Sequence, residues 1–383
     1  MGRSWKDHPA WSLVAAASDA SGRDVGALLL DADADELRRT DNAQLSTYVL
    51  SLVVHEAVRA LGVRCRLAAG HSLGEYSALT ATGALSIEDG VRLVTERGAA
   101  MQAAAAARPG TMAAVLGADD EVVIEACART EGDVWVANTN GAGQVVIAGD
   151  ADAIAEAAAL AKELGARKVM PLPVGGAFHT PFMAPAAERL HAALTSTTFA
   201  NSAVPIVANV DGLPHQHADQ WADLLETQLT APVRWRQTLE RMVADGVTTF
   251  VELGPGSVLT GLAKRTARDA TTLAIADPSG LDALVKAATA IGAVEAPVAE
   301  AAPGQHDGEH LFAAERLIVS PAAGVFVPAD DVLLGNLIER GRVMGHVAGQ
   351  EVRSPFPGTV KGLLAVAGER LTRSQPVAWL RMA

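Results

Sequence analysis

The sequence is poor in cysteine and in positive charge, and each shortage excludes a class of protein. Its two cysteines, Cys65 and Cys127, cannot form a disulfide framework, and their spacing matches no metal site. Lysine and arginine total 31 against 44 acidic residues, so a net charge of −13 disfavours non-specific binding of nucleic acid or anionic lipid. We therefore expect a reducing, cytoplasmic location, no nucleic-acid partner and no metal, with any anionic ligand held at a local basic site.

A long apolar run is also lacking. The first eleven residues, MGRSWKDHPAW, carry charges and a proline where a signal peptide needs an apolar core. No later segment approaches the roughly 20 apolar residues of a membrane span, so no membrane partner is expected. With 383 residues, of which 49% are hydrophobic, the chain can still bury a sizeable core. A globular enzyme or a large binding protein remains.

The order of apolar segments predicts an α/β domain with an insertion. Residues 64–69 are typical of a strand that leads through a sharp turn into a helix, and Ser86 is expected to cap a second helix. Residues 110–174 alternate as strand, helix, strand, strand, helix, strand, which is the split βαβ arrangement. We predict a ferredoxin-like subdomain there, inserted in a larger α/β body. The body strands are expected to resume at residues 204–210 and 248–254.

A change of composition near residue 290 indicates a domain boundary. Residues 290–312 are rich in alanine, proline, glycine and glutamate without apolar periodicity, as in a linker. The remaining chain has short β-prone runs, and VSPAAGV at 319–325 returns as VRSPFPGTV at 352–360. We therefore expect an α/β domain over 1–289 and a small pseudo-symmetric β-sandwich over 313–383.

The segment Gly70-His71-Ser72-Leu73-Gly74 has the form of a nucleophile elbow. A serine on a strained turn between a strand and a helix exposes its hydroxyl group. The Leu73 amide then points at the oxyanion that forms when the serine attacks an acyl carbonyl. A chance match in a chain with 35 glycines is the alternative, and the pattern alone does not separate a hydrolase from a transferase.

A serine nucleophile needs a base, and His179 is the best placed of the ten histidines. It lies where the predicted insertion returns the chain to the body, so its loop can face the elbow. Spacing alone leaves open that it is a loop histidine without a role. His55 lies on an apolar helix and is typical of a core residue. Four further histidines fall in polar loops or in the linker: His215, His217, His306 and His310.

Six segments follow one another along the first part of the chain: GHSLGEYSAL, ERG followed by Met101-Gln102, NTNGAGQVVIAG, PLPVGGAFHTPFMAPA, QLTAPVRW and ELGPGSVLTGLAKR. In this order and spacing they resemble malonyl-CoA:acyl-carrier-protein transacylases, and the resemblance covers about residues 1–289. The resemblance implies a hydrolase-like α/β body and ping-pong transfer of malonyl from malonyl-CoA to the phosphopantetheine thiol of an acyl carrier protein. The pathway would be fatty-acid or polyketide synthesis, and no bound cofactor is implied.

The resemblance also implies roles for individual residues. Ser72 is the acylated nucleophile, His179 is its base, and the main-chain carbonyl of Gln228 orients the His179 ring. Arg97 binds the malonyl carboxylate, for which a guanidinium offers two parallel hydrogen bonds. Without the family pattern, an arginine on a helix is more often a solvated or ion-paired residue. Phe178 matches the form of the motif associated with malonyl rather than branched extender units.

Two further features bear on the partners and on the oxyanion site. Lys264 and Arg265 can supply positive potential for the anionic carrier protein, or they are ordinary helix-surface charges. Members of the family usually begin with a strand ending in Gly-Gln-Gly-Ser-Gln, whose glutamine amide is a second oxyanion donor. Residues 1–9 match the sequence that follows this loop, so we expect either a start assigned too late or an impaired site. Loss of one such donor costs about a hundred- to a thousand-fold in rate.

Residues 313–383 resemble the biotinyl/lipoyl carrier fold, a barrel-sandwich hybrid. Those carriers present a lysine at the tip of a hairpin, where this sequence reads HVAGQE at 346–351, with Gly349-Gln350 expected at the tip. Lys361 is the single lysine of this segment and lies elsewhere. We therefore expect no covalent biotin or lipoate.

Two other functions stay open at this point. A serine hydrolase or thioesterase can use the same elbow, although hydrolysis needs no carboxylate clamp and Arg97 disfavours it. A non-catalytic scaffold is the second alternative, in which the site is silenced by the absent oxyanion strand and the C-terminal segment recruits partners.

Overall fold

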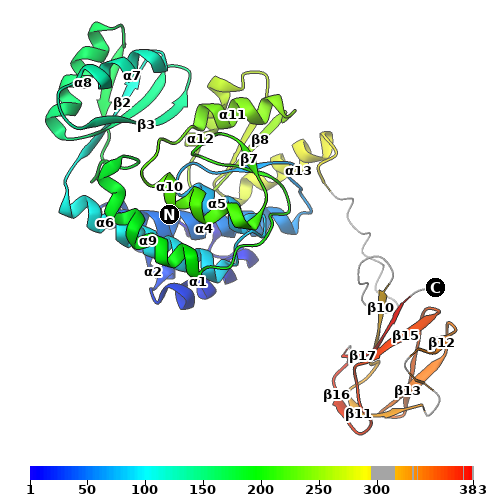
Figure 1. Cartoon of the computed structure of the whole chain (residues 1–383). Helices are drawn as coiled ribbons and strands as arrows, with labels where there is room; N and C mark the ends of the chain where they lie inside the picture. The colour runs from blue at the N-terminus through cyan, green and yellow to red at the C-terminus, as the bar shows by residue number, and fades with distance from the viewer. Residues whose placement is uncertain (295–314, 330–331, 334, 374, 382–383) are drawn as a thin grey trace. The chain divides into compact units, whose positions relative to one another are not determined.

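The computed structural model describes residues 1–294, 315–329, 332–333, 335–373 and 375–381. The chain forms two compact units, Met1–Val298 and Ala299–Ala383, and each has its own hydrophobic core (Figure 1). The first unit continues past residue 289, because the Arg64 amide donates to the Ala293 carbonyl over 2.9 Å. Most of the expected linker, with His306 and His310, lies outside the described residues.

Helices dominate the first unit. The two longest, α4 (Thr40–Ala60) and α6 (Ile87–Ala107), pack on one another, and α6 begins at the predicted cap, where Ser86 Oγ accepts from the Asp89 amide over 3.0 Å. The other α-helices of this unit are α1 (Leu13–Ser21), α2 (Val25–Leu30), α3 (Ala34–Arg38), α5 (Gly74–Ala81), α7 (Asp120–Arg129), α8 (Ala151–Glu163), α9 (Ala184–Ser196), α10 (Trp221–Gln228), α11 (Trp235–Ala244), α12 (Val258–Thr266) and α13 (Leu281–Ala290).

The body strands are shorter than predicted at two of three places. Strand β1 (Ala68–Ala69) pairs in parallel with β6 (Ile206–Val207), which pairs with β7 (Pro214–His215). The expected strands at 64–69 and 204–210 therefore shrink to two residues each, because residues 64–66 are exposed and Pro205 has no N–H to donate. The third prediction is confirmed, since β8 (Thr249–Leu253) pairs in parallel with β9 (Thr271–Ile275).

The insertion has the predicted element order and a core of its own. Its four strands form one antiparallel sheet in the order β3-β4-β2-β5, and α7 and α8 cover one face of it (Figure 1). Their buried faces meet in a separate apolar cluster that includes Val115, Val123, Ile147 and Ala157. The strands are β2 (Thr111–Leu116), β3 (Val134–Gly141), β4 (Gln144–Gly149) and β5 (Lys168–Pro171).

The insertion is joined to the body at the segment after α10. The Thr139 amide of β3 donates to the Val233 carbonyl, and the Val233 amide donates to the Ala137 carbonyl, each over 2.9 Å. An isolated parallel bridge joins Asn138 to Val233. These contacts fix the QLTAPVRW segment, and with it the end of α10, against the edge of the inserted sheet.

The described residues of the second unit form two four-stranded sheets around an apolar core that includes Phe326, Val347, Val360 and Leu380. The sequence repeat has a structural counterpart. Ser320 Oγ donates to the Ala322 carbonyl and Ser354 Oγ donates to the Phe356 carbonyl, each over 2.7 Å, and both serines are buried. The strands are β10 (Glu315–Val319), β11 (Gly324–Pro328), β12 (Leu337–Ile338), β13 (Val343–Val347), β14 (Gln350–Arg353), β15 (Gly358–Leu363), β16 (Arg370–Leu371) and β17 (Pro376–Arg381).

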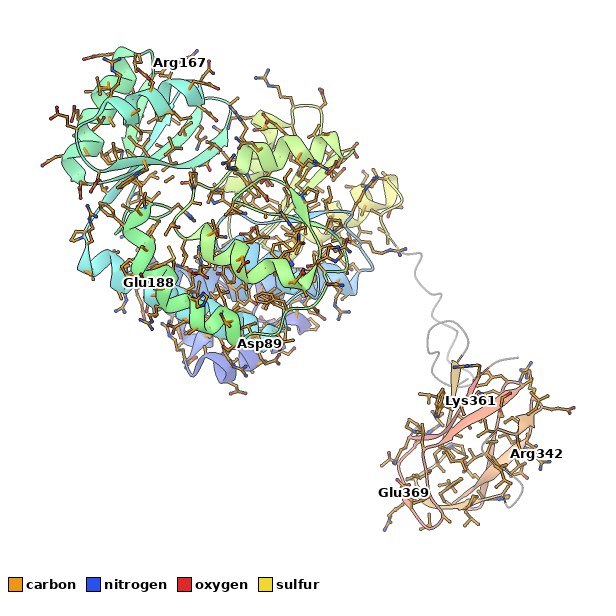
Figure 2. All side chains as sticks on the ribbon, in the orientation of Figure 1. Asp89, Arg167, Glu188, Arg342, Lys361 and Glu369 are labelled. Atoms are coloured by element: carbon orange, nitrogen blue, oxygen red, sulfur yellow. The ribbon has the colours of Figure 1, made fainter. Side chains whose placement is uncertain are left out.

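The hairpin tip expected at Gly349-Gln350 is shifted by one residue. Ala348 and Gly349 have φ values of 49° and 76°, as a tight two-residue turn between β13 and β14 requires. Gln350 instead pairs with Val347 in the ladder. Lys361 lies on β15, away from this turn, and is exposed (Figure 2).

Within the described residues, no helix has the length and apolar character needed to cross a membrane. The same part of the chain holds no cluster of histidine, cysteine or acidic side chains that suits a metal ion. Cys65 and Cys127 are both free thiols.

Candidate active site

The turn between β1 and α5 presents Ser72 in a strained conformation. Ser72 has a φ of 52°, in the left-handed region that side chains rarely adopt. The turn is so tight that a Cβ atom on Gly70 would lie 1.8 Å from the Gly74 carbonyl oxygen. Two side chains hold the Ser72 backbone: Asn209 Oδ1 accepts from its amide over 2.7 Å, and Gln228 Nε2 donates to its carbonyl over 2.9 Å. The tertiary structure thus keeps the serine in the elbow geometry.

His179 lies against the serine although 107 residues separate them. Its Nε2 is 2.8 Å from Ser72 Oγ, and its Nδ1 is 2.8 Å from the main-chain oxygen of Gln228. The carbonyl can only accept, so Nδ1 carries the proton and Nε2 offers its lone pair to the serine hydroxyl. Burial, and then the nearby Arg97 charge, lower the pKa of His179 to about 3. The ring is therefore a neutral base across the physiological range.

Arg97 of α6 is buried beside the same serine, with 1% of its surface exposed. Its Nη1 donates to Gln44 Oε1 over 2.5 Å, and its Nη2 donates to Gln228 Oε1 over 2.8 Å and to Ser72 Oγ over 3.1 Å. All three acceptors are neutral, and Nε has no hydrogen-bond partner within the described part of the chain. A buried cation whose hydrogen-bond acceptors are neutral suits an incoming carboxylate, which would supply the acceptor that Nε lacks.

Sequence reasoning missed a buried acid under the elbow. Glu75, in the first turn of α5, is 1% exposed, and burial raises its pKa to about 7. Its Oε1 accepts from the Asn209 amide over 2.9 Å and its Oε2 accepts from Gln228 Nε2 over 2.5 Å. The sequence signal that was available is its position directly after the elbow. A charged residue there begins a helix of otherwise mostly apolar residues and, if the helix is buried, must find a polar partner.

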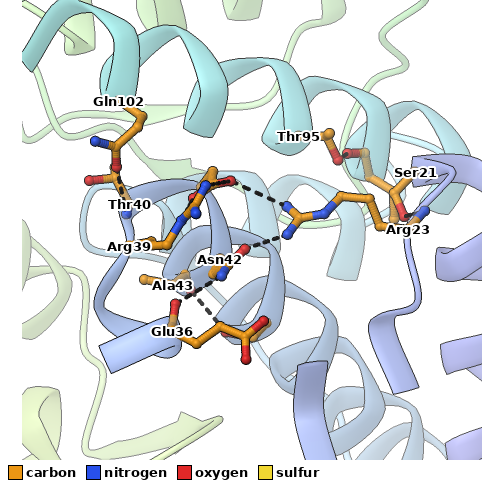
Figure 3. A network of polar contacts seen from close by, with 12 residues as sticks. Ser21, Arg23, Glu36, Arg39, Thr40, Asn42, Ala43, Thr95 and Gln102 are labelled. Carbon is orange, nitrogen blue, oxygen red and sulfur yellow. Dashed lines mark hydrogen bonds and ion pairs between the residues drawn. The ribbon is translucent and has the colours of Figure 1, made fainter. Parts of the chain in front are cut away.

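Gln44 was also missed, and the packing of α4 on α6 delivers it to Arg97. The two helices approach closely at Gly98 of α6, where a Cβ atom would lie 2.9 Å from the Asp41 Cα atom of α4. Gln102 Oε1 of α6 accepts from the Thr40 amide over 3.1 Å and so caps the first turn of α4 (Figure 3). In the same view, Asn42 accepts from Arg23 and donates to the Glu36 carbonyl. This network fixes the end of α4 that carries Gln44.

The remaining predicted residues differ in their distance from the site. Leu73 is the N-cap residue of α5, so its amide belongs to the unsatisfied N–H groups at a helix start. Phe178 precedes His179 and packs, partly buried, on the main core. Lys264 and Arg265 are exposed in the last turn of α12, and the contacts of the described residues do not link them to Ser72. The structure therefore brings together Ser72, Leu73, His179, Arg97 and Gln228, but leaves this basic pair outside.

A groove of about 490 Å³ adjoins His179. One wall comes from α7 and β3 of the insertion, with Ile124, Cys127 and Trp135, and the other from the body, with Pro181 and Pro232. The lining is mainly apolar, so the groove suits an uncharged part of a thioester substrate rather than phosphate groups.

Comparisons with known proteins place the chain among acyl transferases. The model of the family described as "Acyl transferase domain" matches residues 11–306. The chain is similar to the malonyl CoA-acyl carrier protein transacylase of Bacillus subtilis (strain 168), with 41% identity over 68% of this chain and 84% of the relative. The transacylase of the same name from Escherichia coli (strain K12) is 41% identical over 71% of this chain and 89% of the relative.

Two solved structures are similar in fold as well as in sequence. An acyl carrier protein S-malonyltransferase from Vibrio cholerae superposes with a TM-score of 0.69 and 38% identity, covering 72% of this chain and 91% of that chain. A malonyl-transacylase bound to a type II PKS acyl-carrier protein superposes with a TM-score of 0.70 and 36% identity, covering 73% of this chain and 91% of that chain. The mixed α/β fold of the first unit is therefore shared with these transferases.

Proposed function

The chain belongs to the acyl transferase family as an acyl-carrier-protein S-malonyltransferase, and we propose that its transfer proceeds through an acyl-enzyme on Ser72. The reaction takes malonyl from malonyl-CoA and passes it to an acyl carrier protein, for fatty-acid or polyketide synthesis. The residue roles that follow are supported by the geometry of the site.

His179 serves both half-reactions as the base. Its Nε2 takes the Ser72 hydroxyl proton as Oγ attacks the thioester carbonyl, and it returns the proton to the departing sulfur of CoA. In the second half, the phosphopantetheine thiol gives its proton to His179 and attacks the malonyl ester, after which Ser72 leaves and recovers the proton. The Gln228 carbonyl holds the ring in the required tautomer and takes the place of a triad acid.

The observation that carries the malonyl assignment is the position of Arg97. Its Nη2 lies 3.1 Å from Ser72 Oγ, its Nε is unpartnered within the described residues, and its acceptors are neutral. A carboxylate bound there lies about one methylene group from a carbonyl placed for attack, which is the malonyl geometry. Phe178 beside the base is the residue we propose to restrict branching at that methylene.

The Leu73 amide is the oxyanion donor in this proposal, because it sits at the start of α5 next to the nucleophile. The printed sequence contains no Gly-Gln-Gly-Ser-Gln segment, so we assign no second donor. For the anionic carrier protein, the exposed Lys264 and Arg265 are the proposed docking charges.

We also propose domain assignments. The antiparallel β3-β4-β2-β5 sheet with two helices on one face supports a ferredoxin-like subdomain in a hydrolase-like body. The two sheets and the repeated serine turns of the second unit support a biotinyl/lipoyl-like barrel-sandwich over residues 313–383. Its β13–β14 turn has alanine and glycine at the tip, so no covalent cofactor is proposed.

The experiment that tests the mechanism is intact-mass and peptide mass spectrometry after incubation with malonyl-CoA. One malonyl group is expected on the Ser72 peptide, and a holo carrier protein should remove it. Ser72→Ala should abolish the adduct. The control Ser77→Ala, which changes the fourth residue of α5, should retain it. A malonyl adduct that persists in Ser72→Ala on another residue would overturn the assignment.

A further inference from the structure

Glu75 is a buried acid next to the nucleophile that the mechanism above does not use. Both of its oxygens face donors: the Asn209 main-chain N–H at 2.9 Å and the Gln228 side-chain N–H at 2.5 Å. This is the arrangement of an ionised carboxylate, since a protonated acid would have to turn a hydrogen toward a donor. Its place in the first turn of α5 favours negative charge further.

The Gln228 side chain connects this acid to Arg97. Gln228 Nε2 donates to Glu75 and to the Ser72 carbonyl, while Gln228 Oε1 accepts from Arg97 Nη2 over 2.8 Å. The main-chain oxygen of the same residue holds His179. One residue therefore contacts the buried acid, the buried cation, the nucleophile's backbone and the base.

The link between Glu75 and Arg97 affects the charge balance of the buried site. The hydrogen-bond acceptors of Arg97 within the described chain are neutral, and it is buried, so it needs a nearby negative charge before any substrate is bound. Glu75 supplies that negative charge from the other side of the Gln228 side-chain amide. The titratable groups that face Glu75 come from its own helix, from α6 and from the segment after β6: they are Tyr76, Arg97 and Asp211.

We propose that Glu75 is a positioning residue for malonyl transfer: through the Gln228 amide it balances the charge of Arg97 and fixes the amide so that its oxygen faces the guanidinium. This inference rests on the proposed function, because it concerns the same carboxylate clamp.

The substitution Glu75→Gln tests the proposal sharply, since it keeps the shape and removes one acceptor. Whichever way the new amide turns, its NH₂ faces either the Asn209 N–H or the Gln228 NH₂. A 180° flip of the Gln228 side-chain amide removes the clash between the two NH₂ groups. The flip also points the Gln228 oxygen at the Ser72 carbonyl and its NH₂ at Arg97. No arrangement of the two amides satisfies every donor and acceptor, so the clamp is misaligned.

The unmodified enzyme offers an independent measurement, its pH profile. Burial raises the pKa of Glu75 to about 7, whereas burial lowers the pKa of His179 to about 3. As pH falls through about 7, Glu75 gains a proton and Arg97 loses its balancing charge, while His179 stays neutral. Malonyl kcat/KM should therefore fall on the acid side with an apparent pKa near 7. A profile that is flat from about pH 5.5 to 8.5 would overturn the proposal even if the variant failed to fold.

The closing experiment is a double-mutant cycle on the rate of Ser72 acylation by malonyl-CoA. We expect Glu75→Gln to lower kcat/KM about 100-fold in the native background but less than about 3-fold in an Arg97→Gln background, because the acid acts through the arginine. Glu88→Gln, an exposed first-turn acid of α6, is the matched control and should leave the rate unchanged.

Three outcomes separate the two proposals. If Glu75→Gln lowers kcat/KM by the same factor in both backgrounds, and the melting temperature is unchanged, the acid acts independently of Arg97. That result would overturn the inference. A Glu75→Gln rate within about 3-fold of the native rate would overturn it as well. Failure of the native enzyme to form the Ser72 adduct would instead overturn the proposed function.

Discussion

The Arg97 guanidinium donates from Nη2 to Ser72 Oγ over 3.1 Å, although the residues are 25 positions apart and belong to different elements. This contact places the binding group for a carboxylate directly against the nucleophile. An acyl group held by its carboxylate at Arg97 must therefore present its thioester carbonyl within a short reach, which favours malonyl over longer diacids. The relationship also means that the resting serine hydroxyl accepts from a cation while it donates to His179.

Removal of the guanidinium should change the choice of acyl donor. Arg97→Ala is expected to lower Ser72 acylation by malonyl-CoA about 100-fold more than acylation by acetyl-CoA, because only malonyl carries the carboxylate that the guanidinium binds. The measurement is kcat/KM with each donor. Arg92→Ala, on the exposed side of the same helix, serves as the control. Equal losses with both donors would exclude the clamp.

The same substitution at the two glycines of the elbow should change stability by very different amounts. Gly70→Ala places a methyl group 1.8 Å from the Gly74 carbonyl oxygen, so we expect a loss of about 3 kcal/mol in the free energy of unfolding. Gly74→Ala meets open space and should change stability by less than about 0.5 kcal/mol. Denaturant titration of both proteins makes the comparison, and similar midpoints would contradict the steric account of the turn.

The buried neutral His179 predicts how stability depends on pH. In the unfolded chain it takes a proton below its ordinary pKa of 6.5, whereas in the folded chain burial lowers the pKa to about 3. The unfolded state thus binds more protons between these values, so the free energy of unfolding should decrease as pH falls from 6.5. His179→Asn removes this contribution, and the native protein should lose more stability than the variant between about pH 6.5 and 5. Parallel pH dependence of the two would contradict the burial of a neutral ring.

The second unit should carry no covalent cofactor. Its hairpin turn consists of Ala348 and Gly349, and its single lysine, Lys361, lies on a strand. Protein purified from its own source is expected to show no biotin or lipoyl mass and no streptavidin signal. An adduct mapped to Lys361 would show that this strand, rather than the turn, is the acceptor.

Deletion of residues 313–383 should leave malonyl transfer to a free carrier protein within about 3-fold of the native rate. The reason is that the first unit has its own core and holds every proposed catalytic residue. The assay compares kcat/KM of the full chain and the shortened chain. A shortened protein that melts cooperatively but does not transfer malonyl would assign the second unit a part in the reaction.

The residues alone were sufficient for the features that local physics decides. The glycine-flanked serine predicts the elbow because a tight turn between a strand and a helix leaves no room for a side chain at Gly70. Ser86 predicts a helix start because its hydroxyl satisfies an exposed N–H three residues on. The order of elements in the insertion follows from apolar periodicity over short windows. These choices depend on neighbours within a few positions.

The tertiary structure was needed for everything that depends on pairing between distant buried polar groups. Gln44, Glu75 and Asn209 look like ordinary helix or strand-end residues in the sequence, and their roles arise from partners 53 to 153 positions away. The exposure of residues 64–66 in the folded chain also shortened the strand at residues 68–69, and the strand at residues 206–207 is likewise shorter than its apolar segment predicted. A buried donor must find whatever acceptor the folded core places beside it, and no local pattern records which residue that is.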